Sequence, residues 1–168
     1  SASSSALPWS RESEDVLHHT VTCDSAVLAL AVDDVRGRML VGTQPGDIRV
    51  WHLPTFEVQA DLVGHRSSVL SLVLSDDYVF SASSDSTVRV WDAETLQPCA
   101  CVFPASTNTG DFYSLAWDAK AQVLYMGCQD TSIEWISITR ARLHEAASEP
   151  LWPTACLLYT SPSPRDKR

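Results

Sequence analysis

The stretch GHRSSVLSLVLSDDYVFSASSDSTVRVWD, residues 64–92, decides the fold of this chain. It holds short runs rich in Val, Leu, Phe and Trp, separated by Ser, Asp and Thr. β-Branched and aromatic residues favour strands, whereas Asp and Ser favour the tight turns between strands. A helix would need longer runs with apolar residues every three to four positions. The stretch therefore predicts consecutive β-strands joined by tight turns.

The same order of runs occurs three times along the chain. The first runs read AVLALAVDD, VLSLVLSDD and FYSLAWDAK, and each is followed by a second and a third run. Aligning the third runs places Trp51, Trp91 and Ile136 in one column, at intervals of 40 and 45 residues. A repeat of this length indicates a series of supersecondary units that pack on one another. We therefore expect an all-β fold.

These features resemble the WD40 family, whose units of about 40 to 45 residues each form a four-stranded blade of a β-propeller. The second repeat carries the markers of that family. It has Gly64-His65 before its first run and the dipeptide Trp91-Asp92 at the end of its third. The resemblance implies a partial propeller of about three four-stranded antiparallel blades.

The resemblance also implies a hydrogen-bonded set in the second blade. In this sequence its members are His65, Ser83, Asp85 and Trp91, with Ser81 as the other candidate for the hydroxyl. A buried indole N–H, an imidazole and an ionised carboxylate all need partners, and one network can satisfy them together. The implied role of the set is structural.

The other two repeats depart from this pattern. The first keeps Trp51 but has His52 where Asp is usual. The third keeps Asp130 but has Trp135 one position early, so that Ile136 stands in the family column. We expect these blades to be held together mainly by apolar packing.

The expected organisation has four parts. Residues 1–16 form a disordered N-terminal segment, residues 17–138 the partial propeller, residues 139–155 a loop or linker, and residues 156–168 a tail, while the blades lie near 24–63, 64–104 and 110–138. Within the propeller, residues 17–23 (LHHTVTC) are expected to add a strand to another blade. Three blades do not close a ring that usually takes four to eight, so we expect open apolar faces at both ends.

The tail, residues 156–168, differs in origin from the rest of the chain according to its sequence. Residues 156–166, CLLYTSPSPRD, resemble the translation of a sequencing adapter. Residues 156–168 are therefore predicted to be an artefact of library preparation, and the natural protein is expected to continue in another way after Ala155.

A narrower resemblance is carried by VLALAVDD, GTQPGDIRVWHLPTFE, HRSSVLSLVLSDD, GDFYSLAWD and YMGCQDTSIEW. These words are similar to the N-terminal WD-repeat region of the fungal subunit that degrades cytosolic glutathione. In that family the region precedes a zinc-dependent M20-type peptidase domain and the subunit joins a glutamine-amidotransferase-like partner. The resemblance implies a non-catalytic scaffold within a larger peptidase subunit. A WD-repeat adaptor of an unrelated regulatory complex is the alternative.

Composition limits the partners and the compartment. The net charge of −9 and the isoelectric point near 4.8 disfavour binding to nucleic acid, which needs clustered Lys and Arg. No run is apolar enough to predict a membrane span or a signal peptide, so a cytosolic or nuclear location is expected, and the resemblance to the glutathione-degrading subunit implies the cytoplasm. The cysteines are odd in number and lack a C-x-x-C pair, which favours reduced thiols: Cys23, Cys99, Cys101, Cys128 and Cys156.

The histidines, serines and acidic pairs of the sequence are better interpreted as structural residues than as catalytic ones. His18 and His19 are adjacent, and neighbouring side chains of a strand point to opposite faces, so they do not form one metal site. The serines of residues 81–86 lack a G-x-S-x-G elbow. The acidic pairs at 33–34 and 76–77 lie where strands are expected to end and are interpreted as turn formers. We expect no catalytic residue, metal or cofactor in this chain.

Overall fold

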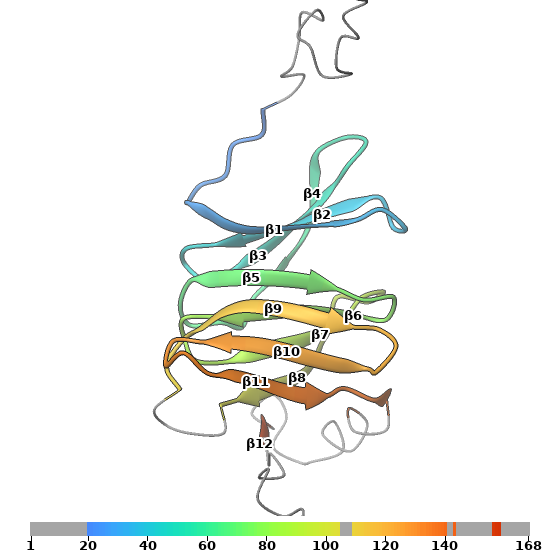
Figure 1. Ribbon diagram of the computed structural model, residues 1–168. Helices are drawn as coiled ribbons and strands as arrows, with labels where there is room; N and C mark the ends of the chain where they lie inside the picture. Colours follow the sequence, from blue (N-terminus) through green and yellow to red (C-terminus); the bar gives the residue numbers. More distant parts are fainter. Residues whose placement is uncertain (1–19, 105–108, 141–142, 144–155, 159–168) are drawn as a thin grey trace, which may run out of the picture.

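The computed structural model describes residues 20–104, 109–140, 143 and 156–158 (Figure 1). Eleven of its strands form three antiparallel sheets that follow one another along the chain. The prediction of an all-β fold with successive antiparallel sheets is confirmed. The N-terminal and C-terminal segments, residues 1–16 and most of 139–168, fall outside the described residues.

Sheets 1 and 2 each follow a simple up-and-down order. Sheet 1 contains β1 (Val27–Asp33), β2 (Arg38–Thr43), β3 (Ile48–His52) and β4 (Glu57–Leu62). Sheet 2 contains β5 (Val69–Leu74), β6 (Tyr78–Ser83), β7 (Val88–Asp92) and β8 (Pro98–Phe103). The first strands of the sheets lie side by side, with β5 between β1 and β9 (Figure 1).

Sheet 3 is smaller than the sequence predicts. It contains β9 (Phe112–Asp118), β10 (Val123–Cys128) and β11 (Ile133–Ser137), so the described part of the chain supplies three strands rather than four. After β11 the backbone N–H of Leu143 donates to the carbonyl of Thr139, a bond of helical spacing that replaces the turn to a fourth strand.

Two segments outside the eleven strands given above also differ from expectation. Residues 20–23 are not in a strand, so the described part of the predicted strand at 17–23 is wrong, and residues 17–19 are not described. The short strand β12 (Cys156–Leu158) pairs in parallel with β8 and adds a fifth strand to sheet 2. The adapter origin of residues 156–168 stays a prediction.

The turns explain how the sheets keep their register. The residues Gly46, Ser86 and Thr131 occupy the same place between the second and third strands of each sheet, and all have positive φ. Glycine adopts this conformation freely, whereas the other two residues are strained by about 1–2 kcal/mol. The same backbone path therefore recurs three times although its sequence changes.

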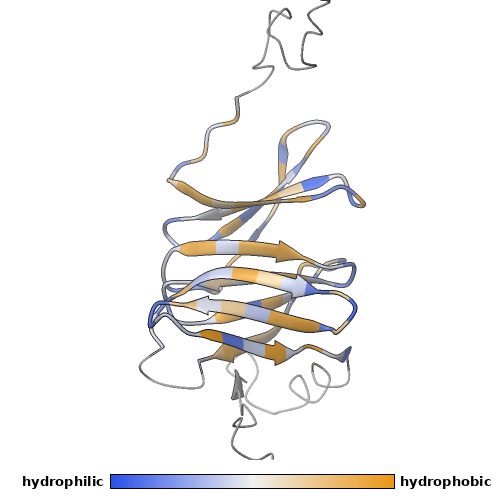
Figure 2. Cartoon of the chain, viewed as in Figure 1, coloured by the Kyte–Doolittle hydropathy of each residue, from blue (hydrophilic) through white to orange (hydrophobic). Residues whose placement is uncertain are grey.

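Sheet 2 lies in the middle of two apolar cores. One face packs on sheet 1 in a core that includes Leu40, Val50 and Trp91. The other face packs on sheet 3 in a core that includes Phe80 and Leu124. All six residues of β6 are consequently buried. Figure 2 shows the resulting runs of apolar residues along the inner strands.

Two arginines at the β1–β2 end of sheet 1 bind the β7–β8 turn of sheet 2, one through a hydrogen bond and one through an ion pair. The guanidinium of Arg38 is buried, bonds Asp33 at 3.0 Å and also donates to the carbonyl of Ala93 in sheet 2. Arg36 reaches the same sheet through Glu94 at 2.9 Å. Asp33 Oδ1 also accepts the backbone N–H of Arg36 at 3.1 Å, which agrees with the interpretation of Asp33 as a turn former.

Candidate functional site

A buried polar network lies in sheet 2, on the face that packs against sheet 1. The indole Nε1 of Trp91 donates to Ser81 Oγ at 2.9 Å, and Ser81 Oγ lies 2.8 Å from His65 Nε2. His65 Nδ1 is 3.0 Å from Asp85 Oδ2, and Thr87 Oγ1 donates to Asp85 Oδ1 at 2.6 Å. The network therefore joins the segment before β5 to β6, to β7 and to the turn between them.

The directions of these bonds follow from the chemistry of the groups. An ionised carboxylate only accepts, so Nδ1 of a neutral His65 carries the proton that is donated to Asp85. The other ring nitrogen, Nε2, then accepts the O–H of Ser81. The Ser81 oxygen in turn accepts from Trp91. Each buried polar group in this chain of bonds has a partner of the right kind.

Asp85 is the anionic end of the network. Burial acts to raise the pKa of this carboxyl, but hydrogen bonds from His65, from Thr87 and from the backbone N–H of Arg66 hold the pKa well below its usual range. The carboxylate is therefore ionised at neutral pH and anchors His65 through a charge-assisted bond.

Serine, histidine and aspartate stand here in the order of a hydrolase triad, yet the arrangement does not support nucleophilic attack. Ser81 is completely buried, and its oxygen already accepts the indole N–H of Trp91. A nucleophile needs an open approach and oxyanion donors beside it. The network can orient strands and satisfy buried groups, which is a structural role.

Ser83, the first choice for the hydroxyl, lies outside the contact between His65 and Trp91. Its Oγ donates to the carbonyl of Ser67 at 3.0 Å and accepts from the backbone N–H of Asp85 at 3.0 Å. Ser81 and Ser83 share one face of β6, but Ser83 lies at the end of the strand, about 6.6 Å further along, where its hydroxyl holds the turn. The structure therefore places the alternative, Ser81, between His65 and Trp91.

Thr87 is a member of the network that sequence reasoning missed. Its backbone N–H and its hydroxyl both bind Asp85 Oδ1, at 3.0 and 2.6 Å. Asp130 Oδ1 binds the N–H and hydroxyl of Ser132 in the matching turn of sheet 3. An Asp followed two residues later by Ser or Thr is the sequence signal that could have found both turns.

Sheet 1 retains the tryptophan but lacks the network. Trp51 pairs with Met39 as Trp91 pairs with Val79, so Val41 occupies the position of Ser81. The indole Nε1 of Trp51 is buried and has no hydrogen-bond partner. An unpaired buried donor costs about 1–3 kcal/mol. In sheet 1, a hydroxyl at position 41 would therefore give the Trp51 indole N–H the acceptor that it lacks.

A reciprocal pair of variants tests this comparison. Ser81→Val is expected to lower the free energy of unfolding by about 1–2 kcal/mol, because Trp91 and His65 lose their shared partner. Val41→Ser is expected to lower it less, by about 1 kcal/mol or under, because the new hydroxyl can accept from Trp51 and so offsets much of the apolar contact that the buried Val41 loses. Urea unfolding of both variants measures the difference. Equal losses from the two changes would contradict the argument.

In sheet 3, apolar side chains occupy the positions that form the hydrogen-bonded network in sheet 2. Met126 and Ile136 stand where sheet 2 has Ser81 and Trp91, and both pack in the core against sheet 2. Trp135, the residue before the column, points the other way and is exposed. Asp130 is exposed, and hydrogen bonds from Ser132 lower its pKa.

The dipeptide Trp91-Asp92 ends in a turn. Asp92 Oδ1 accepts from the backbone N–H groups of Glu94 and Thr95 and from the Thr95 hydroxyl. In sheet 1 the residue at this place is His52, which contacts the hydroxyl of Thr55 at 3.1 Å. The aspartate of the second repeat thus fixes the β7–β8 turn.

A cavity of about 430 Å³ opens beside these turns, far along the sheets from Ser81. Its lining contains both signs of charge: Arg36, Asp77, Tyr78, Asp92, Glu94, Pro98, Cys99, Arg140 and Leu143. Burial raises the pKa of the Cys99 thiol to about 11, so the thiol is protonated at neutral pH and is a poor nucleophile. Asp92 and Glu94 already bind the turn and Arg36.

The sequence also raised the questions of a histidine pair, a metal site and a membrane span. His18 and His19 lie outside the described residues. Within the described ranges no three His, Cys, Asp or Glu side chains come close enough to hold a metal ion. No helix of the described part is long and apolar enough to cross a membrane.

Comparison with known proteins agrees with the geometry of sheet 2. Residues 56–92 match the family model described as WD domain, G-beta repeat. A zinc finger CCCH domain-containing protein of Oryza sativa subsp. japonica is 42% identical over 88 residues, 50% of this chain and 19% of that protein. Cell division control protein 4 of Candida albicans is 41% identical over 112 residues, 56% of this chain and 16% of that protein.

A third relative matches a longer part of the chain. The protein named "Probable di- and tripeptidase" of Saccharomyces cerevisiae is 26% identical over 143 residues, 74% of this chain and 16% of that protein. The chain thus spans less than a fifth of the length of each of these curated relatives. It carries a WD40 repeat at residues 56–92, within an all-β arrangement consistent with blades of a partial WD40 propeller.

Proposed function

We propose that this chain is a non-catalytic interaction scaffold and part of a larger cytoplasmic peptidase subunit that acts in glutathione catabolism. The non-catalytic role is supported by the bonding of the residues that most resemble a catalytic group. Ser81 and His65 are buried, Asp85 is partly buried, and His65 is bonded to both of the others, so the three residues stabilise a sheet and leave the exposed loops to bind other proteins. WD40 domains generally mediate contacts between proteins.

The second half rests on the match to the yeast peptidase. That match extends over 143 residues and therefore over sequence on both sides of the generic WD40 repeat at 56–92. In this proposal the chain itself holds no cofactor, and a zinc-dependent domain follows it in the natural protein. A glutamine-amidotransferase-like subunit is the proposed partner, and residues 156–168 are proposed to derive from a sequencing adapter.

A WD-repeat adaptor of an unrelated regulatory complex is the second candidate. It is favoured by the higher identity to Cell division control protein 4, 41% over 112 residues. The two candidates differ in what the natural reading frame encodes beyond Ala155.

The deciding experiment recovers the full transcript and assays its product. The proposal expects a zinc-dependent peptidase-like domain and, together with the amidotransferase-like partner, glutathione cleavage that a chelator abolishes. The matched control is the same protein without residues 20–138, which should keep its metal but lose the partner in a co-purification. A complete reading frame without a peptidase domain would sink the proposal and favour the adaptor.

A further inference from the structure

Two positions of the repeat contact each other in sheets 1 and 3. One position precedes the first strand of the sheet, and the other lies in its third strand. In sheet 1 they hold Asp24 and Arg49, which form an ion pair of 3.2 Å. In sheet 3 they hold Thr109 and Glu134, and the threonine hydroxyl donates to the carboxylate at 3.1 Å. The backbone therefore brings these two side chains within direct reach of each other.

In sheet 2 the same two positions hold Arg66 and Arg89. The first position lies two residues before a carbonyl that accepts from the residue following the second strand: Ala26, Ser68 and Asp111. The second position pairs with equivalent residues of the second strand: Val41, Ser81 and Met126. Two positive charges consequently stand where sheet 1 has an ion pair and sheet 3 has a hydrogen bond.

The guanidinium of Arg89 also lacks the second acid of sheet 1. Nε of Arg49 donates across the strands to Asp61 at 2.8 Å. Arg89 pairs across the strands with Cys101 at this place, so no carboxylate is supplied there. Nε of Arg89 is buried and has no hydrogen-bond partner. A buried donor without an acceptor calls for a physical explanation, and an absent ionic partner is one.

The segment of residues 64–66 holds the two arginines near each other. A Cβ atom at Gly64 would lie 2.9 Å from Nη1 of Arg89, so the guanidinium rests directly against this segment. The backbone N–H of Arg66 donates to Asp85 at 2.9 Å, which fixes its backbone while the residue stays exposed. Neither arginine side chain takes part in an ion pair within the described residues.

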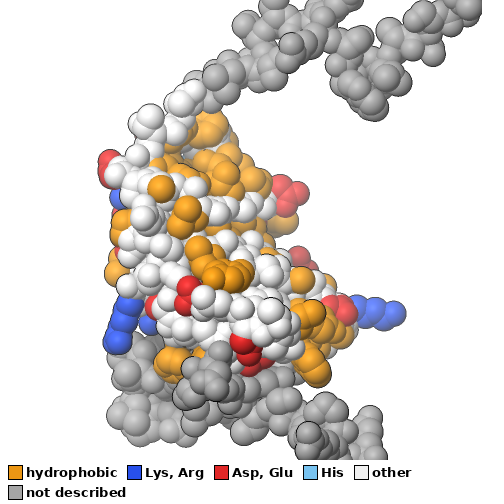
Figure 3. Space-filling view, turned by 60° about the vertical axis from the view of Figure 1, so that its left-hand side comes forward, with side chains coloured by type: hydrophobic (Ala, Val, Ile, Leu, Met, Phe, Trp, Pro, Cys, Tyr) orange, Lys and Arg blue, Asp and Glu red, His pale blue; other side chains and the backbone are white. Residues whose placement is uncertain are grey.

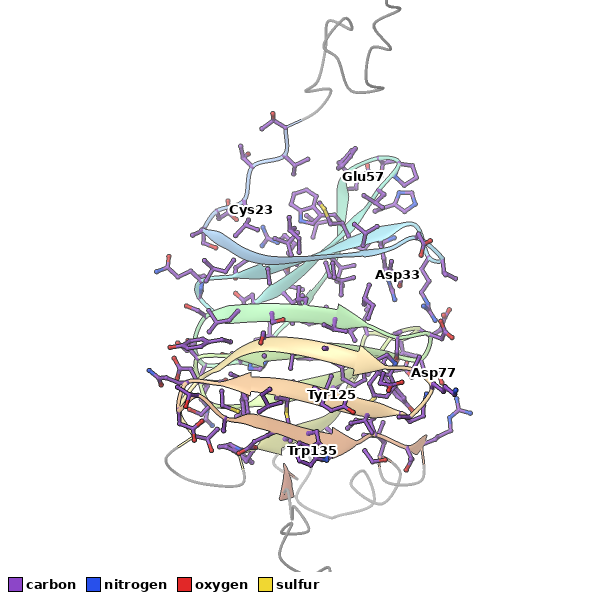
Figure 4. All side chains as sticks on the ribbon, viewed as in Figure 1. Cys23, Asp33, Glu57, Asp77, Tyr125 and Trp135 are labelled. Carbon is purple, nitrogen blue, oxygen red and sulfur yellow. The ribbon has the colours of Figure 1, made fainter. Side chains whose placement is uncertain are left out.

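The pair lies at the end of the sheets where the first strands begin. Cys23, the neighbour of Asp24, marks this end in sheet 1 (Figure 4), and β5 begins at the same end (Figure 1). Figure 3 turns this end forward, and the Lys and Arg side chains drawn there lie at its margins. The pair belongs to sheet 2, which packs on a neighbouring sheet with each face. In a chain of net charge −9, two unpaired arginines form a local exception.

We propose that Arg66 and Arg89 bind a carboxylate side chain from an acidic segment of a partner protein. The partner's carboxylate takes the acceptor role that Asp24 has beside Nη1 of Arg49 in sheet 1. A guanidinium offers parallel N–H donors that match the two oxygens of a carboxylate. The inference rests on the proposed scaffold role and names the chemistry of the partner.

The test measures binding of a fluorescent peptide of alternating glutamate and glycine to the full 168-residue chain, by anisotropy at low salt and up to millimolar concentrations. Arg66→Gln and Arg89→Lys are each expected to weaken binding at least about tenfold, since the first removes a charge and the second removes the parallel donors. Arg49→Gln is the matched control, because it removes the same charge from the same position of sheet 1, and it should bind like the parent. The same peptide with glutamine in place of glutamate should not bind.

Arg66→Asp tests the site without loss of the Arg89 guanidinium. It gives sheet 2 the pair that Asp24 and Arg49 form in sheet 1, so an acid of the chain itself occupies Arg89. Peptide binding should be lost, while the melting temperature stays at least as high as that of the parent. Circular dichroism checks that every variant keeps its strands, and added salt should weaken binding to the parent.

Three outcomes would overturn the proposal. One is a parent chain that does not bind the glutamate peptide, and another is an Arg66→Asp variant that binds it like the parent. The third is a chain that binds inorganic phosphate through these arginines but not the glutamate peptide, because the site would then select phosphate. The scaffold role would survive each of them if the partner still co-purified through residues 20–138.

Discussion

Trp91→Ala is expected to lower the free energy of unfolding by about 3–5 kcal/mol. The indole of Trp91 is almost fully buried between sheets 1 and 2, and its N–H is bonded to Ser81. The change therefore leaves a cavity and also deprives the Ser81 oxygen of a donor. Urea unfolding, followed by circular dichroism, measures the loss.

Trp51→Ala is the matched control, because Trp51 has the same place in sheet 1. Trp51 is 8% exposed against 1% for Trp91, and its buried N–H has no hydrogen-bond partner, so the change breaks no hydrogen bond and the expected loss is smaller, about 1–3 kcal/mol. A Trp51→Ala loss as large as that of Trp91→Ala would show that position in the strand, and not the hydrogen-bond network, sets the free energy of unfolding.

The order of the strands could be predicted because two signals agree for each strand. One is the amino-acid composition of the strand, and the other is its position within the repeat. The column of Trp51, Trp91 and Ile136 falls on the third strand of every sheet, although its members differ in size and polarity. The open apolar faces could also be predicted, since three sheets leave two faces uncovered. Those features depend on sequence patterns that span many residues.

Sequence patterns could not decide whether Ser81 or Ser83 supplies the hydroxyl between His65 and Trp91. Both are small, both are buried, and both lie on the same face of β6, so periodicity does not separate them. The decision depends on register, because Trp91 stands opposite Val79 and its indole therefore reaches Ser81. A shift of two residues moves a hydroxyl by about 6.6 Å and breaks every bond of the network.

Sheet 3 has three strands among the described residues, and residues 20–23 are not in a strand, and the two differences have a related cause. A strand at the edge of a sheet is stabilised by pairing on one side only, so its composition decides little by itself. Residues 20–23 are rich in Thr, Val and Cys, which favour strands, but they have no strand to pair with among the described residues. Pairing partners, rather than local propensity, determined these outcomes.

Asp85→Asn is expected to lower the free energy of unfolding by about 1–3 kcal/mol at neutral pH. The change removes the charge that holds His65 and leaves donors of Thr87 and Arg66 with weaker partners. Because the pKa of Asp85 is lowered in the folded chain, its contribution is fully present above the ordinary carboxyl pKa of about 4 and is lost as the pH falls towards the lowered value. The gap between parent and variant should therefore be constant from about pH 5 upwards and shrink below about pH 4.

Asp130→Asn provides the control for this pH dependence. Asp130 holds the matching turn of sheet 3 and its pKa is also lowered by Ser132, but it is exposed, and among the described residues no histidine is bonded to it. Its substitution should cost less than that of Asp85, because solvent can replace the lost bonds. Urea unfolding of the parent and both variants at a series of pH values gives the comparison. If the Asp85 gap widened on acidification, the carboxyl would have a raised pKa in the folded chain and the proposed donor directions in the network would have to be reversed.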